Sequence, residues 1–593
     1  MSTVFDRDSS RRLFVQSVSR SFVPLLAGVL YTVTASRVLL GGDSAELAAV
    51  GATGGVAHPP GYPLYILWLR ATSWLPATSP AHRAALATAI LGALSVAALQ
   101  QACVAWGARQ RTAAVAAAIY AVSPLAWRLA TEPEVFALNV LLAMGIVIFA
   151  APGPPPRGSE TLRVAVLALL AGLGISNHHT IVLLAPLGLW ASVRALRHAR
   201  APGLAALAGI STLAIGLSAY AYLVVASRAA PLDAGCVWGD TGTASGLLHH
   251  FLRKDYGTTQ LAVSTAAPDP VRHWVVLGHS LLGSCGLPLF GLAVFRVRRE
   301  RVATLMLVAC FVLTGPALVS LFNLPSHGVG RLVVSRFHLL PLALGVHLGA
   351  VGLDRALAFV PRRAGAALLA VIAPLLGVRA ACSWADVRAD HRPTTELYVR
   401  NVLTTLPENA IVLASSDDVI GGFLYARCAL GLRPDVDVIS PHLLLSDWYP
   451  RRLSAKLGYE VVRGVRRPGA EHPTLSGPAL LTQTLATGRP VFLTAWFVPQ
   501  LATSFPSYPV GPLIRVVDRP EAVLAPGPLL ALNERVFERL DLEGVPAPPG
   551  TWAGARAADY ARPWLVLAQA FERGGDPTAA AWCRERARTL TPR

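Results

Sequence analysis

Two carboxylates, a histidine and a stiff proline-rich segment lie close together near the start of this sequence. Asp43 and Glu46 occur in GGDSAE, and residues 58–65 read HPPGYPLY, with His58 and Tyr62. A carboxylate beside a low-dielectric phase can have its pKa raised towards neutral pH and can then take a proton from an attacking hydroxyl group. Asp43 could instead cap a helix at 44–53, but its spacing of one helical turn from Glu46 favours the general-base role.

Further polar residues that suit this chemistry are scattered along the chain. An arginine can hold a phosphate through two hydrogen bonds and can stabilise the charge on a departing lipid phosphate. The candidates for substrate binding are His58, Tyr62, Glu132, Glu134, His178, His179, Trp238, Asp240 and Arg336.

Structural roles are the alternative for several of these residues. Glu132 could be a solvated loop acid, Glu134 could stabilise the N-terminus of the following helix, and Arg336 could be an interface anchor. His178 and His179 fit a turn better than a metal site, because no third ligand stands at a fixed spacing. We therefore predict no resident metal and no cofactor besides a lipid-phosphate sugar donor, and the sequence leaves open whether a divalent ion assists.

The composition indicates that membrane helices position these residues. The 593 residues are 53% hydrophobic and only 15% charged, with a mean hydropathy of +0.49, whereas soluble domains have about 25% charged residues. The apolar content excludes a disordered chain, and 50 glycines with 45 prolines exclude a coiled coil. Seven cysteines without a CxxC spacing support neither a zinc module nor a dense disulfide framework, and most of them fit apolar packing positions.

Eleven apolar runs are long enough to cross a hydrocarbon core of roughly 30 Å. They lie near residues 21–40, 85–106, 112–130, 135–151, 164–176, 180–193, 203–226, 272–295, 302–322, 338–353 and 364–381. The shorter run 62–75 carries Arg70 and fits an interfacial or re-entrant helix better than a span. The first run lacks a cleavage pattern and is read as an uncleaved anchor.

Arginines fix the orientation of these spans, because cytoplasmic loops hold the excess of positive charge. The 52 basic residues include only two lysines, Lys254 and Lys456. Eighteen arginines fall in alternate segments, namely 7–20, 109–111, 157–163, 194–200, 296–301 and 355–363. The N-terminus is therefore predicted to be cytoplasmic, and every candidate site residue then falls on the outer face. The bias towards arginine and alanine favours a GC-rich bacterial genome, in which the outer side would be the periplasm.

This topology divides the chain into four parts. Residues 1–20 form a cytoplasmic N-terminus, and residues 21–382 form the membrane domain, with a first outer loop at 41–84 and a long outer loop at 227–271. Short apolar runs at 410–415, 436–440, 490–494 and 513–517 predict buried strands, with a helix at 421–430, so residues 383–520 are expected to form a small extracytoplasmic α/β domain. Residues 521–593 are helical and end in a helix pair at 554–592 that is similar to one tetratricopeptide unit. Trp564, Leu567, Ala568 and Phe571 are placed on one face of the pair, and Ala579, Trp582 and Ala587 on the next.

These motifs resemble a known family, the GT-C fold protein O-mannosyltransferase-like proteins related to eukaryotic transmembrane protein 260. The resemblance rests on GGDSAELAAVGATGGVAHPPGYPLY (41–65), EPEVFALN (132–139), GISNHHT (174–180), WGD with HHFLRKDYG (238–240 and 249–257), LRPDVDVIS (432–440) and LLLSDWYPRRL (443–453). It implies a GT-C-like bundle and an inverting transferase that uses a polyprenyl-phosphate sugar, with Asp43 as general base and Glu46 in support. Residues 415–427, SSDDVIGGFLYAR, depart from the more polar stretch of the family, so the resemblance supports no site contact from the tail.

We expect a membrane glycosyltransferase that moves a mannose-like sugar to a hydroxyl of a protein, lipid or glycan at the extracytoplasmic face of the plasma membrane. A transporter or flippase is the alternative, but such proteins place ionisable residues near the midplane and often have two related halves. A non-catalytic scaffold whose tail recruits partners is a third reading. Nucleic acid is excluded as a partner, because the arginines do not gather on one polar face.

Overall fold

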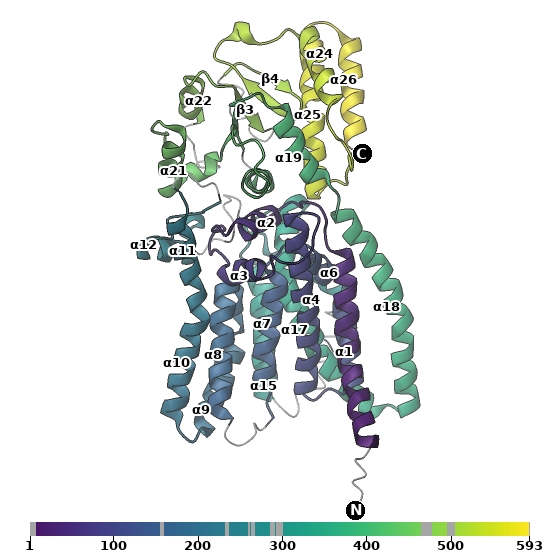
Figure 1. Ribbon diagram of the computed structural model, residues 1–593. Coiled ribbons are helices and arrows are strands. Elements are labelled where there is room, and N and C mark those ends of the chain that lie inside the picture. The colour runs from purple at the N-terminus through teal and green to yellow at the C-terminus, as the bar shows by residue number, and fades with distance from the viewer. Residues whose placement is uncertain are drawn as a thin grey trace, which may run out of the picture.

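The structure is a computed structural model in which a helical bundle carries a smaller α/β domain on one end (Figure 1). It describes residues 7–153, 159–231, 236–258, 261, 267–284, 291, 301–414, 416–463, 477–494 and 505–591. Parts of the predicted span at 272–295 and of the arginine segments at 157–163 and 296–301 lie outside the described residues. The N-terminal helix begins at the end of the bundle that lies away from the α/β domain (Figure 1).

The bundle is built from long apolar helices with short connections. Its elements are α1 (Arg7–Thr34), α4 (Pro80–Ala105), α5 (Gln110–Ala121), α6 (Pro124–Thr131), α7 (Phe136–Phe149), α8 (Glu160–Asn177), η1 (His179–Leu184), α9 (Ala185–His198), α10 (Pro202–Leu217), η2 (Ser218–Tyr220), α11 (Ala221–Ala229), α13 (Pro270–Gly283), α15 (Arg301–Val312), η5 (Leu313–Ala317), α16 (Gly328–Ser335), η6 (Arg336–His338), α17 (Leu339–Ala356), η7 (Leu357–Phe359) and α18 (Arg362–Asp390). α18 runs without a break through the predicted domain boundary at 382–383.

Several of these helices fit a polytopic membrane protein. Among the described residues, five helical stretches are long and apolar enough to cross a membrane, namely Pro80–Ala105, Glu160–Asn177, His179–His198, Pro202–Ala229 and Gly328–Phe359. The pair α5 and α6 makes a sixth if it counts as one span, although it is bent by 67°. Shorter apolar helices are Ser21–Thr34, Phe136–Phe149 and Arg301–Ala317. The count of eleven spans stays a prediction.

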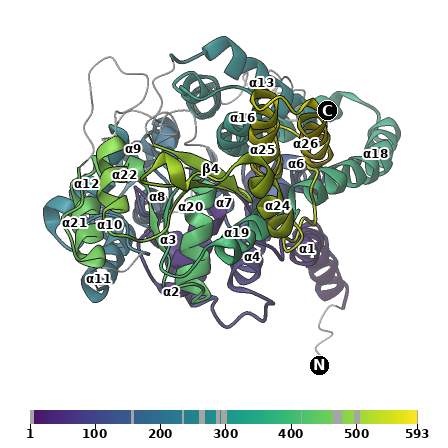
Figure 2. The same cartoon turned by 90° about the horizontal axis from the view of Figure 1, so that it is seen from above.

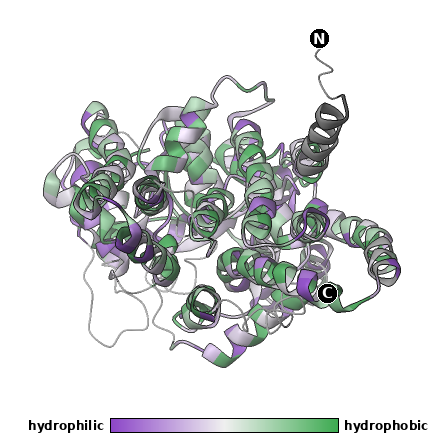
Figure 3. Ribbon diagram, turned by 90° about the horizontal axis from the view of Figure 1, so that it is seen from below, coloured by the Kyte–Doolittle hydropathy of each residue, from purple (hydrophilic) through white to green (hydrophobic). Residues whose placement is uncertain are grey.

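Large apolar side chains point outward from the bundle. Val33 on α1, Ile210 on α10 and Val378 on α18 are each more than 60% exposed. Seen from below, hydrophobic residues run along the bundle helices (Figure 3). A soluble protein rarely exposes such continuous apolar surface, so lipid is the natural partner of these faces.

Short helices lie between the bundle and the α/β domain. They are α2 (Ser44–Thr53), α3 (Pro63–Ala71), α12 (Ala244–Phe251) and η3 (Lys254–Tyr256). Residues 44–51 of α2 are all buried, because the bundle covers one side of this helix and α20 of the tail covers the other. α3 falls in the run 62–75, which was predicted to be an interfacial or re-entrant helix, and it lies at the top of the bundle beside α2 (Figure 1).

The tail contains a five-stranded sheet in the order β2-β1-β3-β5-β4. β1 (Ile411–Leu413) pairs in parallel with β2 (Asp437–Ile439) and β3 (Val491–Thr494), while β5 (Leu513–Val516) is antiparallel to β3 and to β4 (Ser507–Val510). The helical elements of the tail are α19 (Thr394–Thr405), α20 (Asp417–Leu424), η8 (Tyr425–Ala429), η9 (Pro441–Leu445), α21 (Trp448–Leu457), α22 (Gly477–Leu485), η11 (Pro520–Ala522), α24 (Pro526–Phe537), α25 (Trp552–Arg573) and α26 (Pro577–Leu590). The four predicted strands are all present, and β4 is an additional one.

The predicted helix pair corresponds to α25 and α26, which pack on each other and on α19 and α24. Trp564, Leu567, Ala568 and Phe571 are buried as predicted. Trp582 is 44% exposed, but its ring centre lies 5.6 Å from that of Trp564, so it contacts the facing helix at the edge of the pair; Ala580, Cys583, Ala587 and Leu590 form the buried stripe of α26. The likeness to a tetratricopeptide unit stays a prediction.

A disulfide joins the long outer loop to the tail. Cys236 lies in the loop that follows α11, and Cys428 lies in η8, 192 residues further along the chain. The cysteine spacing did not reveal this pair, because two cysteines so far apart give no local pattern. Both cysteines are cross-linking residues and not the simple packing residues expected for most of the seven.

Candidate active site

Asp43 stands at the N-terminus of α2, but its carboxylate does not cap the helix. Its backbone is αR, and within the described part of the chain its side chain makes no capping hydrogen bond. Instead, Arg336 Nη1 donates to Asp43 Oδ2 at 2.8 Å. The ion pair joins the first outer loop to η6, which lies almost 300 residues later.

Arg336 holds a second carboxylate at the same time. Its Nη1 also donates to Glu134 Oε1 at 2.6 Å, and the Glu134 side chain is only 3% exposed. The guanidinium carbon lies 5.9 Å from the ring centre of Phe136, at the start of α7. One buried arginine thus balances two carboxylates, one from α2 and one from the turn between α6 and α7.

The pKa values of the two carboxyl groups respond differently to this arrangement. Burial pushes the pKa of Asp43 upward, but Arg336 and His58 outweigh burial and leave the pKa below its ordinary value. Burial dominates at Glu134 and raises the pKa of that carboxyl group, with the charge of Asp43 adding to the effect. Asp43 is therefore the carboxylate that stays ionised.

His58 and Glu46 form a second ion pair next to Asp43. His58 Nδ1 contacts Glu46 Oε2 at 2.5 Å, and the backbone N–H of His58 donates to Glu46 Oε1 at 2.8 Å. His58 Nε2 lies 2.9 Å from the hydroxyl oxygen of Tyr62 and 4.0 Å from Asp43 Oδ2. Burial alone would lower the pKa of His58, but Glu46 and Asp43 raise it to about 9, so the imidazole is protonated at neutral pH.

The proline-rich turn fixes where His58 and Tyr62 point. Gly61 has a φ of +91°, and a Cβ at this position would lie 2.7 Å from Leu223 and 3.0 Å from His250. Only glycine accommodates both the left-handed backbone and the close contacts. The turn folds back so that Tyr62 lies beside His58 and precedes α3.

The two adjacent histidines of the turn after α8 separate. The ring of His178 stacks on Tyr62, with centroids 5.9 Å apart, and its Nδ1 lies 2.8 Å from Thr180 Oγ1. Burial lowers the pKa of His178 to about 3, so this imidazole is neutral. His179 instead contacts the Tyr220 hydroxyl at 3.1 Å and packs on Phe251. Of the predicted pair, the structure brings only His178 to the Asp43 cluster.

Glu132 is not the solvated loop acid that its sequence context allowed. Its side chain is 14% exposed and lies 3.6 Å from Arg128, which also approaches Asp390 of α18 at 3.8 Å. Burial raises the pKa of Glu132 to about 8, and Arg128 only partly offsets this effect.

A cleft opens on the Arg336 side of the cluster, and we call it the arginine cleft. It holds about 610 Å³ of space, part of it open to solvent. Its charged lining residues are Arg128, Arg336, Arg392, Glu132, Glu134 and Asp390. Trp552 of α25 forms one wall and approaches Gly41 so closely that a Cβ there would lie 2.4 Å from the indole. The tail therefore closes over a site that is otherwise built by the bundle.

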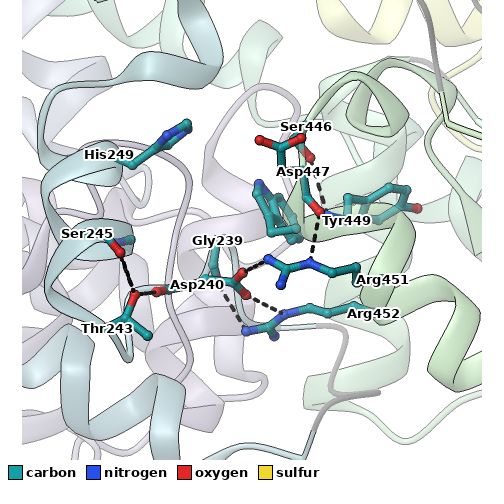
Figure 4. Close-up of polar contacts among 12 residues, drawn as sticks. Gly239, Asp240, Thr243, Ser245, His249, Ser446, Asp447, Tyr449, Arg451 and Arg452 are labelled. Carbon is teal, nitrogen blue, oxygen red and sulfur yellow. Dashed lines mark hydrogen bonds and ion pairs between the residues drawn. The ribbon is translucent and has the colours of Figure 1, made fainter.

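Trp238 and Asp240 belong to the outer loop, and the structure places them differently. The ring centre of Trp238 is 6.1 Å from that of His58, so Trp238 borders the cluster. Asp240 points towards α21, where it pairs with Arg451 and lies 3.8 Å from Arg452 (Figure 4). Asp240 thus joins the loop to the tail and does not reach Asp43, contrary to its grouping with the other candidates.

One acid of the tail belongs to the site but was not predicted. Asp417 begins α20, which packs on α2, and its charge acts on Asp43, His58 and Tyr256. Burial raises the pKa of Asp417 to about 6, and the charge of Asp43 adds to this. The sequence contains Asp417 and Asp418 in SSDD, but this stretch departs from the family pattern and gives no local sign of a site contact.

The described residues contain no group of three or more histidine, cysteine or acidic side chains placed to hold a metal ion. The predicted lack of a resident metal is not tested by this observation. The cluster contains groups that transfer to a hydroxyl needs: an ionised carboxylate, an arginine at its side and the arginine cleft beside them.

Comparisons with known proteins bear on both sequence and fold. Residues 43–200 match a family model described as the protein O-mannosyl-transferase TMEM260 N-terminal domain. The chain is 29% identical over 480 residues to protein O-mannosyl-transferase TMEM260 of Mus musculus and 25% identical over 472 residues to its namesake from Dictyostelium discoideum. The resemblance to the TMEM260 proteins is confirmed. The alignments cover 76% and 71% of this chain but only 66% and 57% of these TMEM260 relatives, so the chain spans less than two thirds of their length.

Solved structures show the same fold outside the TMEM260 proteins. ArnT from Cupriavidus metallidurans bound to undecaprenyl phosphate has a TM-score of 0.52 with 13% identity, covering 84% of this chain and 97% of ArnT. The apo form of ArnT gives a TM-score of 0.51 with 14% identity over the same shares. The TMEM260-like chain therefore has the GT-C architecture that its motifs predicted.

Proposed function

We propose that this chain is a membrane glycosyltransferase that moves a mannose-like sugar from a polyprenyl phosphate to a hydroxyl group at the extracytoplasmic face. The observation that carries the proposal is the ion-paired cluster of Asp43, Arg336 and Glu134 beside His58 and Glu46. The names of the TMEM260 relatives support O-mannosyl transfer to protein, and the undecaprenyl phosphate bound by ArnT supports a lipid-phosphate donor.

Arg336 is the group that meets the donor phosphate. In the structure its guanidinium is shared by Asp43 and Glu134, and it faces the arginine cleft together with Arg128. A phosphate oxygen entering the cleft competes with Asp43 for the same N–H donors. Donor binding then loosens the Asp43 ion pair, raises the basicity of the carboxylate and readies it to accept a proton.

The transfer is a single displacement at the anomeric carbon. Asp43 takes the proton of the acceptor hydroxyl as the acceptor oxygen forms its bond to the sugar. The bond between the anomeric carbon and the phosphate oxygen breaks on the opposite side, and its electron pair leaves with the polyprenyl phosphate. Arg336 stabilises the charge on that departing phosphate, and the single displacement inverts the anomeric centre.

The neighbouring residues hold this arrangement. Protonated His58 keeps Glu46 fixed and adds positive charge 4.0 Å from Asp43. Neutral His178, stacked on Tyr62, and the buried acids Glu132 and Glu134 shape the sugar pocket. No divalent ion is required in this scheme, because an arginine can neutralise a monophosphate leaving group.

The disulfide supports an extracytoplasmic site. Cys236 and Cys428 join the outer loop to the tail, and structural disulfides persist in oxidising compartments. The α/β domain, the outer loop and the Asp43 cluster therefore lie outside, with the N-terminus in the cytoplasm and the bundle in the plasma membrane.

The proposal is tested by incubating the purified full-length protein with polyprenyl-phosphate mannose, glucose or arabinose in the presence of peptide, lipid or glycan acceptors. Release of polyprenyl phosphate together with a glycosylated acceptor is expected, preferentially with mannose and unaffected by a chelator. Movement of the lipid-linked sugar between leaflets of a proteoliposome without formation of a glycosidic bond would instead identify a flippase.

A further inference from the structure

A second cleft, separate from the arginine cleft, is lined by Glu46 of the Asp43 cluster. It holds about 900 Å³ of space, part of it open to solvent, between α2, the outer loop, α20, β2 and α21. Glu46 lines its inner end, and Trp238, Phe423 and Trp448 are among its apolar walls. We call it the β2 cleft, since Val438 and Ser440 of the β2 region form part of its lining.

The cationic side chains around the β2 cleft are already engaged. Arg427 lies 3.7 Å from Asp437, and Lys456 also pairs with Asp437. Arg452 donates to the carbonyl oxygens of Val237 and Gly239 and lies 3.8 Å from Asp240 (Figure 4). The cleft therefore offers apolar surface and not free charge, which disfavours an anionic or heavily hydroxylated occupant.

The backbone along the edge of β2 supplies free hydrogen-bonding groups to this cleft, whose cationic side chains are already paired. β2 is the edge strand of the sheet, and its only pairing within the described residues is with β1. Asp437 and Ile439 direct their backbone groups to β1, because Asp437 N donates to Ala410 O and Ile439 O accepts from Ala414 N. Alternate residues of a strand point their backbone groups to opposite sides, so those of Val438 face away from β1.

These outward groups of Val438 are open to a partner. Among the described residues, none forms a backbone hydrogen bond with the N–H or C=O of Val438. The flanking positions are occupied: the N–H of Ser440 donates to the Tyr449 hydroxyl at 2.8 Å, and Arg427 donates to the carbonyl of Val436. A partly buried strand edge with a free donor and acceptor is the surface to which another extended strand adds.

We propose that the β2 cleft binds the acceptor as an extended polypeptide, which pairs with Val438 of β2 and presents a Ser or Thr hydroxyl beyond Glu46 to Asp43. This assignment rests on the proposed glycosyl transfer and adds the acceptor class and its binding mode. The donor phosphate then enters through the arginine cleft and the acceptor through the β2 cleft, so the two substrates reach Asp43 by separate clefts. Apolar side chains on alternate residues of the peptide pack against Trp448 and Phe423.

The disulfide fits this role of the cleft. Cys236 is one of its lining residues, and the segment 236–238 is held to Val56 by hydrogen bonds from Val56 N to Cys236 O and from Trp238 N to Val56 O. The wall formed by the outer loop is thus fixed to both the bundle and the tail. A cleft with fixed walls binds an extended chain at a lower entropic cost.

The test measures binding of a blocked peptide of alternating valine and threonine to the full-length Asp43→Asn protein in detergent, followed by the fluorescence of Trp238 and Trp448. Val438→Pro removes the outward N–H without touching the ladder to β1, and it should weaken binding roughly tenfold, as expected for the loss of one or two hydrogen bonds. Val438→Ala is the matched control, since it keeps the backbone donor, and it should bind nearly as tightly as the parent.

Peptides that carry a single N-methyl group provide a second readout that does not depend on a variant. Methylation should weaken binding at alternate residues only, because every second N–H of an added strand faces β2. The proposal would be overturned if the Val438→Pro protein bound the peptide as tightly as the parent and all N-methylated peptides bound equally well. It would also be overturned if the protein bound a soluble oligosaccharide but no peptide. Peptide binding to the Asp43→Asn protein is measured without a donor, whereas transfer is followed separately as polyprenyl phosphate release. A failure of peptide binding is therefore distinguishable from a failure of transfer.

Discussion

The guanidinium of Arg336 binds two carboxylates, and this shared contact determines how the site can receive a donor phosphate. Asp43 and Glu134 both accept a hydrogen bond from Nη1, and Asp43 is the one of the two that stays ionised. A phosphate that binds at Nη1 must take a hydrogen bond from one of them. Asp43, the more exposed of the two at 26% against 3%, is the carboxylate that gives way.

Arg336→Lys tests this role of the guanidinium. Lysine keeps the charge but cannot serve two acceptors and a phosphate through a planar fork. We expect kcat to fall roughly 10²–10³-fold, the range seen when one oxyanion donor is removed, and the KM for the donor to rise. Polyprenyl phosphate release measures both parameters. Arg331→Lys, an exposed arginine of α16, is the control, and an Arg336→Lys protein with normal kcat and donor KM would contradict the assignment.

The ion pair of His58 and Glu46 predicts a pH-dependent stability. The pKa of His58 is raised from 6.5 to about 9 in the folded protein. A raised histidine pKa stabilises the fold fully below pH 6.5, and the contribution is lost as the pH rises towards 9. The shift corresponds to a contribution on the order of 3 kcal/mol.

His58→Gln is the variant that isolates this contribution. The Tm of the parent protein should fall between pH 6.5 and 9 more steeply than that of His58→Gln, measured by thermal unfolding in detergent. Parallel Tm curves for the two proteins over this interval would show that the ion pair does not titrate as described.

At the scale of single residues, the sequence predicted a set of residues on one face, and the structure brings Asp43, His58, Glu134 and Arg336 of that set together. Asp240 and His179 belong to the same predicted set but point elsewhere, because a shared side of the membrane does not determine which way a side chain turns. Asp417 was missed because the docking of α20 on α2 leaves no local pattern in the sequence.

Different sequence patterns predict the helices of the bundle and the strands of the sheet. Apolar runs between arginine segments predicted helices such as α4 and α8, and short runs of β-branched residues predicted β1 and β3. β4 was missed, because SYPV contains Pro509 and is mostly only partly buried, as suits an edge strand. The bend of 67° between α5 and α6 was also not predicted; Ser123 caps α6 and Pro124 opens it, which starts a new helix direction.

Removal of the disulfide should lower the stability of the molecule. Replacing Cys236 and Cys428 together by serine should cost about 2–5 kcal/mol of stability, the usual range for a native disulfide. The expected result is a lower Tm that a reducing agent does not lower further, whereas the parent loses stability on reduction. Cys382→Ser, at an exposed cysteine outside the disulfide, serves as the control. An unchanged Tm in the double variant would mean that the outer loop and the tail are held together by other contacts.

Taken as a whole, the molecule forms the candidate site between two bodies. The bundle supplies Asp43, Glu134 and Arg336, while the tail supplies the covering helix α20 and the wall at Trp552 (Figure 1, Figure 2). The sequence predicted both bodies, but their docking depends on contacts such as Arg451 with Asp240, which join residues more than 200 positions apart. Contacts between residues so far apart in the chain produce no periodic pattern in the sequence.

The orientation of the two bodies predicts which parts a membrane-impermeant thiol reagent reaches. In a background with Cys382→Ser, Asp518→Cys in the tail should be labelled in cells with an intact plasma membrane, because the proposed topology puts the tail outside. Ser9→Cys in the N-terminal segment should be labelled only after the membrane is permeabilised. The opposite pattern would reverse the topology and place the site in the cytoplasm.

The central claim is that Asp43 is the general base of sugar transfer, and Asp43→Asn tests it most directly. The measurement is formation of glycosylated acceptor from polyprenyl-phosphate mannose by purified protein, with Asp269→Asn, an exposed helix cap on the outer face, as the matched control. The account predicts that Asp43→Asn is correctly folded by gel filtration but at least about 10²-fold slower, as expected for loss of a general base, while Asp269→Asn is fully active. Transfer by Asp43→Asn at the parental rate would contradict it.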